Sequence, residues 1–192
     1  MSQKNIWIEM KKEEENNDLD KSFYHNYGKF VIEFEHLVLS IKICIFSLIT
    51  NKGLSEPDFL RVILADQTAL PLKTKLQTLI SIHFKESLER NKLLEKLFTH
   101  TEKVIERRNE IVHGVILNIS NEKGFLFKDK TNKKGLSPIK QDVDSEMFRK
   151  HTEKIIETKI LFDVLNSYLN QDGEIFEHFF SKEKLDTLNI NS

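Results

Sequence analysis

The chain has 192 residues, of which 39% are hydrophobic and 31% are charged. This length suits one domain with a sizeable core, and the composition is that of a globular protein rather than a disordered one. The formal net charge of -1 excludes a strong positive field over the whole molecule, so any contact with nucleic acid would need a local basic patch.

The single cysteine, Cys44, excludes an internal disulfide and is typical of a reducing compartment. It lies in the apolar stretch 37–49, where we expect a buried, inert thiol. That stretch contains Lys42 and is too short to span a bilayer. The N-terminus lacks the basic and then apolar pattern of a secretory signal. We therefore expect a cytoplasmic protein that makes no contact with a membrane.

The first predicted elements are an acidic flexible leader over residues 1–17 and a long helix that begins near Asp18 or Asp20. Hydrophobic residues recur every three or four positions as far as "FSLIT", which predicts one amphipathic helix. Gly53 can stop it. A shorter helix is expected in "EPDFLRVILADQTAL", and Pro71 starts another through "PLKTKLQTLISIHF". A second long helix runs from about Lys85 to His113, followed by Gly114 as a left-handed stop.

After residue 114 the helical period gives way to an extended pattern. "VILNIS" and "GFLFKDK" are rich in branched and aromatic residues, and the "NEKG" between them predicts a β-hairpin around 115–130. We expect "KDKTNKKGLSPIK" to be a mobile, lysine-rich connection. A third long helix begins near Asp144 or Ser145, and "DGEIFEHFFSKEKL" predicts a short terminal helix.

The fold class predicted from these elements is all-α. We expect a helical bundle with three long helices, shorter ones and the inserted β-hairpin. A single domain would span residues 18–183, with the insert at about 115–140 and a tail over 184–192.

The second long helix carries a cation in its apolar stripe. Its seam positions follow steps of three and four: Leu94, Leu97, Thr101, Val104, Arg108 and Ile111. Burying the guanidinium of Arg108 would cost several kcal/mol unless it is paired and hydrogen-bonded. We expect it either to reach solvent at the end of the bundle or to face a polar cleft.

His113 closes the same helix on a different face. Five residues turn an ideal helix by ~500°, which leaves Arg108 and His113 about 140° apart. Asn109 and Glu110 are the nearer neighbours of His113, so the Asn109 side chain could orient the imidazole through a hydrogen bond. An imidazole at a helix end suits general acid–base chemistry. Two copies related by a two-fold axis could bring both pairs into one cleft.

The stretch "RNEIVHG" (108–114) resembles the signature of the HEPN superfamily, which is an arginine, usually a polar residue, three further positions and then a histidine. The resemblance covers roughly residues 20–170, and only the short motif is distinctive. It implies a metal-independent endoribonuclease that uses no cofactor and acts as a homodimer on RNA. Many relatives belong to toxin–antitoxin, phage-defence or RNA-processing systems, which implies an antitoxin or defence-system protein as a further partner.

The resemblance also implies roles for particular residues. Arg108 would bind the scissile phosphate, His113 would be the general base or acid, and Asn109 would support them. The products would carry 2′,3′-cyclic phosphate ends, because the 2′-hydroxyl of the RNA is the nucleophile. Family members also use a polar or acidic residue from an earlier helix, for which Asp66 is the candidate singled out here, beside Glu33 and Glu35.

Structural alternatives stand beside each of these roles. Arg108 could bridge groups at the bundle end, and His113 could simply favour the helix dipole. Asp66 could lie on a solvated helix face. Several branches of the family are non-catalytic RNA-binding or assembly modules.

The basic hairpin exit and the remaining histidines complete the candidate residues. The lysines there could bind RNA phosphates or could only keep a loop polar; they are Lys128, Lys130, Lys133 and Lys134. The histidines outside the motif show no metal-ligand spacing, so no metal site is expected.

Overall fold

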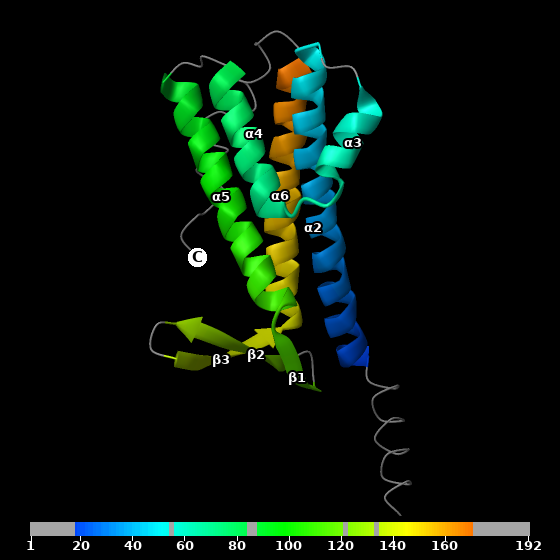
Figure 1. The fold of residues 1–192 in the computed structure, drawn as a ribbon. Coiled ribbons are helices and arrows are strands. Elements are labelled where there is room, and N and C mark those ends of the chain that lie inside the picture. The colour runs from blue at the N-terminus through cyan, green and yellow to red at the C-terminus, as the bar shows by residue number, and fades with distance from the viewer. Residues whose placement is uncertain (1–17, 54–55, 84–87, 121–122, 133–134, 171–192) are drawn as a thin grey trace, which may run out of the picture. The chain divides into compact units, whose positions relative to one another are not determined.

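The computed structural model describes residues 18–53, 56–83, 88–120, 123–132 and 135–170. The predicted leader, the tail and the short terminal helix lie outside these residues. The described elements, in chain order, are α2 (Asp18–Asn51), α3 (Pro57–Ala65), α4 (Ala69–His83), α5 (Leu88–Val112), β1 (Val115–Ser120), β2 (Lys123–Asn132), β3 (Gly135–Asp144) and α6 (Ser145–Asn170) (Figure 1). The predicted helical fold with a small β insert before the last long helix is therefore confirmed.

The contacts of the chain divide it into two compact units. The first unit holds the described part of Met1–Val31 together with Arg108–His151, and the second holds Ile32–Arg107 with the described part of Thr152–Ser192. The division falls inside three helices, α2, α5 and α6. The expectation of a single domain over residues 18–183 stays a prediction.

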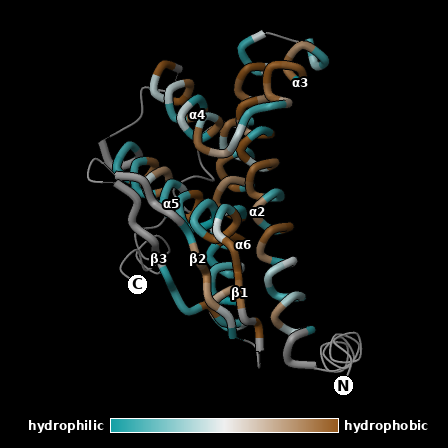
Figure 2. The backbone as a smooth tube through the Cα atoms, turned by 60° about the horizontal axis from the view of Figure 1, so that its bottom comes forward, coloured by the Kyte–Doolittle hydropathy of each residue, from teal (hydrophilic) through white to brown (hydrophobic). Residues whose placement is uncertain are grey.

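The second unit has a helical core whose pattern is clearest on α2. Hydrophobic residues recur along this helix (Figure 2), and those at steps of three and four are buried: Phe34, Leu37, Ile41, Ile45 and Leu48. Fully burying one such side chain stabilises the fold by roughly 1.5–3 kcal/mol. On α5 and α6, Phe98 and Phe162 pack with their ring centroids 6.2 Å apart. The predicted amphipathic helix is thus confirmed.

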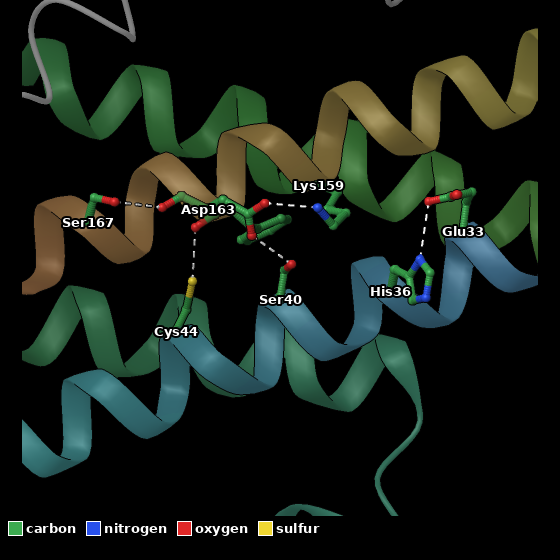
Figure 3. Close-up of polar contacts among 8 residues, drawn as sticks. Glu33, His36, Ser40, Cys44, Lys159, Asp163 and Ser167 are labelled. Carbon is green, nitrogen blue, oxygen red and sulfur yellow. Dashed lines mark hydrogen bonds and ion pairs between the residues drawn. The ribbon is translucent and has the colours of Figure 1, made fainter.

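Polar contacts also join α2 to α6 within the second unit (Figure 3). Ser40 Oγ donates to Asp163 Oδ1 at 2.8 Å, and Lys159 Nζ donates to Asp163 Oδ2 at 3.0 Å. The thiol of Cys44 donates to the backbone oxygen of Phe162 at 3.2 Å. Burial, with the charge of Asp163 as a second cause, raises the pKa of the Cys44 thiol far above its ordinary value. Cys44 is therefore the buried, inert thiol that the sequence predicts.

The first unit contains a three-stranded antiparallel sheet in the order β1-β2-β3. The predicted hairpin forms, with Val115 opposite Phe127 and Leu117 opposite Phe125. The expectation of a mobile connection over "KDKTNKKGLSPIK" is wrong for its described residues, because all of them belong to β2 or β3. Proline is rare in strands because it lacks a backbone N–H, and Pro138 lies in β3. Since β3 is an edge strand, one of its sides needs no hydrogen bonds, and proline is tolerated there.

An aromatic cluster packs the start of α6 against α2 in the first unit. The ring centroid of Phe148 lies 5.2 Å from that of Phe23 and 5.4 Å from that of Tyr27, both in edge-to-face arrangement. Asp144 Oδ1 accepts a hydrogen bond from the backbone N–H of Met147 at 2.6 Å, which is an N-terminal cap for α6. The predicted start of this helix near residue 144 or 145 is confirmed.

Gly114 does not adopt the predicted left-handed conformation. Gly53 does, with a φ of 92°, but the φ of Gly114 lies outside that region. The reason for a glycine at 114 is close packing. A Cβ there would overlap with Cδ1 of Leu126, a buried residue of β2, and would lie 3.2 Å from the backbone oxygen of Glu110. The missing side chain therefore lets β2 approach the end of α5.

Replacing Gly114 should test this packing. We expect Gly114→Ala to lower the free energy of unfolding by about 1–3 kcal/mol, because the added methyl displaces the buried Leu126 side chain. Gly28→Ala is the matched control, since a Cβ on Gly28 would meet nothing within 4 Å. In the interior of α2 it should stabilise the protein by roughly 0.5–1 kcal/mol. Urea unfolding midpoints measure both, and equal effects of the two variants would contradict the packing explanation.

Candidate functional site

Four of the six predicted seam positions of α5 are buried, and two are half-buried. Leu94, Leu97, Thr101 and Ile111 are buried, whereas Val104 and Arg108 are half-buried. Thr101 tolerates full burial because its Oγ1 donates to the backbone oxygen of Leu97 at 2.7 Å. The half-buried guanidinium of Arg108 therefore lies between buried apolar residues of the seam, Leu97 on one side and Ile111 on the other.

Arg108 is held by the residue that follows it. Its Nη1 donates to Oδ1 of Asn109 at 3.2 Å, while its Nε is buried. Asn109 is itself half-buried. The amide of Asn109 is a neutral partner, so this contact offsets part of the desolvation of the guanidinium.

His113 follows directly after the last residue of α5 and is exposed. Its backbone N–H donates to the oxygen of Asn109 at 3.1 Å, and the N–H of Gly114 donates to the oxygen of Ile111 at 3.3 Å. These bonds close the helix and fix the backbone from which the imidazole extends.

The expected side-chain hydrogen bond from Asn109 to His113 does not form. The amide oxygen of Asn109 accepts from Arg108 instead, and in the described part of the chain no hydrogen bond reaches the imidazole. Asn109 contacts Arg108, its neighbour in sequence, whereas His113 is exposed to solvent. The side chain of Asn109 therefore contacts the guanidinium of Arg108 and not the imidazole of His113.

The candidate acidic helpers belong to the second unit, whereas Arg108, Asn109 and His113 belong to the first. Asp66 is exposed and directly follows the last residue of α3. Glu33 accepts a hydrogen bond from His36 Nδ1 at 3.3 Å, and Glu35 is exposed. No observation selects among them, so the acidic helper stays a prediction.

Of the four candidate lysines, only Lys128 has a described side chain. It is half-buried on β2, opposite Ile139. Lys130 is paired with Ser137 in the backbone register, while Lys133 and Lys134 lie outside the described residues. The sequence prediction missed a different cation: Lys140 Nζ lies 4.1 Å from the ring centroid of Phe125. The alternation in "GFLFKDK" was the available signal, since it places Phe125 and Phe127 on one face.

Within the described residues, no group of three or more His, Cys, Asp or Glu side chains could hold a metal ion. None of the helices in the described ranges is both long and apolar enough to cross a membrane.

Comparisons of this chain with protein-family models, with curated proteins and with solved structures find no match. The motif over residues 108–114 and the geometry around it therefore carry the functional argument.

His100 is a buried titratable group in the second unit. Its side chain is only 5% exposed, and its Nε2 has no hydrogen-bond partner among the described residues. Burial lowers its pKa below the ordinary value of 6.5, and the positive charges of Lys154 and Lys103 lower it further. The folded protein therefore keeps this imidazole neutral.

This imidazole should make stability depend on pH. Below pH 6.5 the unfolded chain takes up the proton before the folded protein does, so stability falls as the pH drops toward the lowered pKa. Each unit of pKa difference corresponds to about 1.4 kcal/mol. We expect His100→Gln to lose less stability than the wild type between neutral and mildly acidic pH in urea unfolding. His25→Gln, at an exposed position, is the control and should keep the wild-type slope. An unchanged slope in His100→Gln would contradict the assignment.

Proposed function

We propose that this protein is a metal-independent endoribonuclease of the HEPN type that acts as a homodimer. The observation that carries the proposal is the end of α5: a half-buried Arg108 held by Asn109, followed by an exposed His113 just beyond the last turn. The resemblance of residues 108–114 to the HEPN signature assigns the chemistry. We place the reaction in the cytoplasm, where Cys44 stays a free thiol.

Arg108 suits the binding of a phosphate that gains negative charge. A guanidinium offers paired N–H donors that match two phosphate oxygens, and it stays charged at any working pH. Its contact with Asn109 uses Nη1. In a half-buried position the charge is less screened by water than it would be at the surface, so it stabilises the transition state more strongly.

His113 suits the movement of protons. As base, it removes the proton of the RNA 2′-hydroxyl while the 2′-oxygen forms a bond to phosphorus. The bond from phosphorus to the 5′-oxygen breaks, and that leaving oxygen takes a proton from an imidazolium acting as acid. The products are a 2′,3′-cyclic phosphate and a 5′-hydroxyl. DNA lacks the 2′-hydroxyl and should not react.

A homodimer supplies the geometry that one helix lacks. Residues five apart on an ideal helix point about 140° away from each other, so one copy does not readily aim Arg108 and His113 at one phosphate. A two-fold axis beside the end of α5 would bring two arginines and two histidines together. One imidazole can then act as base and the other as acid.

One observation favours a second candidate function. Among the described residues nothing hydrogen-bonds the imidazole of His113, and a general base is usually oriented by a neighbour. Unless a second subunit orients it, the chain would be a non-catalytic HEPN-like module that binds RNA or a partner protein. An antitoxin or defence-system protein remains the proposed partner in either case.

The reaction can be tested with purified protein and end-labelled RNA in the presence of EDTA. We expect cleavage to products with 2′,3′-cyclic phosphate ends, resolved by phosphatase treatment and mass spectrometry. Arg108→Ala should lower the rate about 100-fold or more because it removes a transition-state donor. His113→Ala should lower it roughly 100- to 10,000-fold because it removes the proton carrier.

Matched variants separate chemistry from folding. Arg107→Ala removes the adjacent arginine, also half-buried, and His25→Ala removes an exposed histidine; both should cleave at nearly the wild-type rate. Circular dichroism checks that every variant is folded. Normal cleavage by folded Arg108→Ala and His113→Ala proteins would disprove the assignment. RNA binding without cleavage by the wild type would favour the non-catalytic module.

A further inference from the structure

The sheet of the first unit has two faces of opposite character. Residues directly opposite each other in paired strands share a face, as do residues two apart on one strand. One face contains Leu126 and Val143, which are buried. The other is the exposed sheet face, made of Val115, Leu117, Lys123, Phe125, Phe127, Lys140 and Asp142.

The exposed sheet face is apolar at its centre although solvent reaches it. Val115 is 56% exposed, Leu117 is 48% exposed and Phe127 is 39% exposed. Val115 and Phe127 are direct partners across β1 and β2, as are Leu117 and Phe125. Core packing explains the opposite face of the sheet, but it does not explain two phenylalanines here.

Two lysine side chains lie on the same face as these aromatic rings. Lys140 lies directly opposite Phe127 in the register, and its Nζ lies 4.1 Å from the ring centroid of Phe125. Lys123 is exposed at the other end of the same face. Asp142 lies opposite Phe125 and adds an exposed carboxylate to this face. The carboxylate of Asp144 caps α6 through Met147 N–H instead.

We infer that the exposed sheet face binds unpaired RNA, with a base stacked on Phe127 and the adjoining phosphate held by Lys140. Aromatic side chains on a sheet stack bases of any sequence, and lysines beside them hold the backbone. This inference rests on the proposed function for its substrate class, and it adds the surface that would hold the strand. Val115 begins this face two residues after His113, so the chain itself joins the two.

A second copy of the chain fits this surface less well. The centres of interfaces between protein chains are depleted of lysine and aspartate. Docking a copy here would bury Lys123, Lys140 and Asp142 among the aromatic side chains. A polyanion instead gains from both lysines, and residues 121–140 carry six lysines against Glu122 and Asp129.

The test measures binding apart from cleavage. Fluorescein-labelled oligouridine and oligoadenosine are titrated with full-length His113→Ala protein, and the anisotropy gives Kd. Adding Phe127→Leu keeps an apolar side chain but removes the ring, and should weaken binding about 5- to 100-fold. Adding Phe127→Trp restores a stacking surface and should return Kd to within a few fold. Phe59→Leu, the same change at an exposed phenylalanine of α3, is the matched control and should have no effect.

The contact between Lys140 and a phosphate is tested by the salt dependence of Kd. Lys140→Gln should lower the slope of log Kd against log salt by about 0.7, the value for one phosphate of a single strand. Lys75→Gln, at an exposed position of α4, should leave the slope unchanged. Sedimentation measures the assembly state of every variant.

Each outcome decides the inference. Loss of affinity in Phe127→Leu, recovery in Phe127→Trp and an unchanged mass of the assembly would support it. Unchanged affinity would overturn it, and so would a changed assembly mass with normal RNA binding, which would identify a contact between chains. If the wild type cleaves RNA while Phe127→Leu binds normally, only this inference fails. If binding depends on Phe127 but the wild type cleaves nothing, only the proposed function fails.

Discussion

The first unit depends on the close approach of β2 to the end of α5. The hydrogen atom in place of a side chain on Gly114 leaves room for the buried Leu126. Because the chain turns there without a bulky residue, His113 falls at the last point before the sheet and Val115 begins the next strand. The exposed imidazole and the exposed sheet face are thus set by one packing contact.

Periodicity predicted most of the fold. The steps of three and four in α2 and in α5 correctly gave the buried residues Leu37, Ile41 and Leu97. The strand β3 was not predicted, since Gly135 and Pro138 weaken a local strand signal and its stability comes from pairing with β2. Gly114 was expected at a helix end, but sequence alone does not reveal the distant Leu126 that requires it.

The candidate site was less predictable than the fold. The spacing of Arg108 and His113 predicts a catalytic pair, and that role stays a prediction. The structure places a half-buried Arg108 in α5 and an exposed His113 directly after it. Spacing offered Asn109 as a neighbour that could orient the His113 imidazole, whereas the amide oxygen of Asn109 accepts from the adjacent guanidinium of Arg108. Lys140 was not among the predicted basic residues, since its place over Phe125 follows from strand pairing rather than from local sequence.

The protected state of Cys44 has a practical consequence. Its thiol is buried and donates to a carbonyl of α6, so it stays protonated and out of reach of alkylating reagents. A cysteine introduced at a solvent-facing position would then be the one reactive sulfur in the folded chain. Dyes or spin labels could be attached there without first removing the native residue, and distances between two such labels would report directly on how copies of the protein associate.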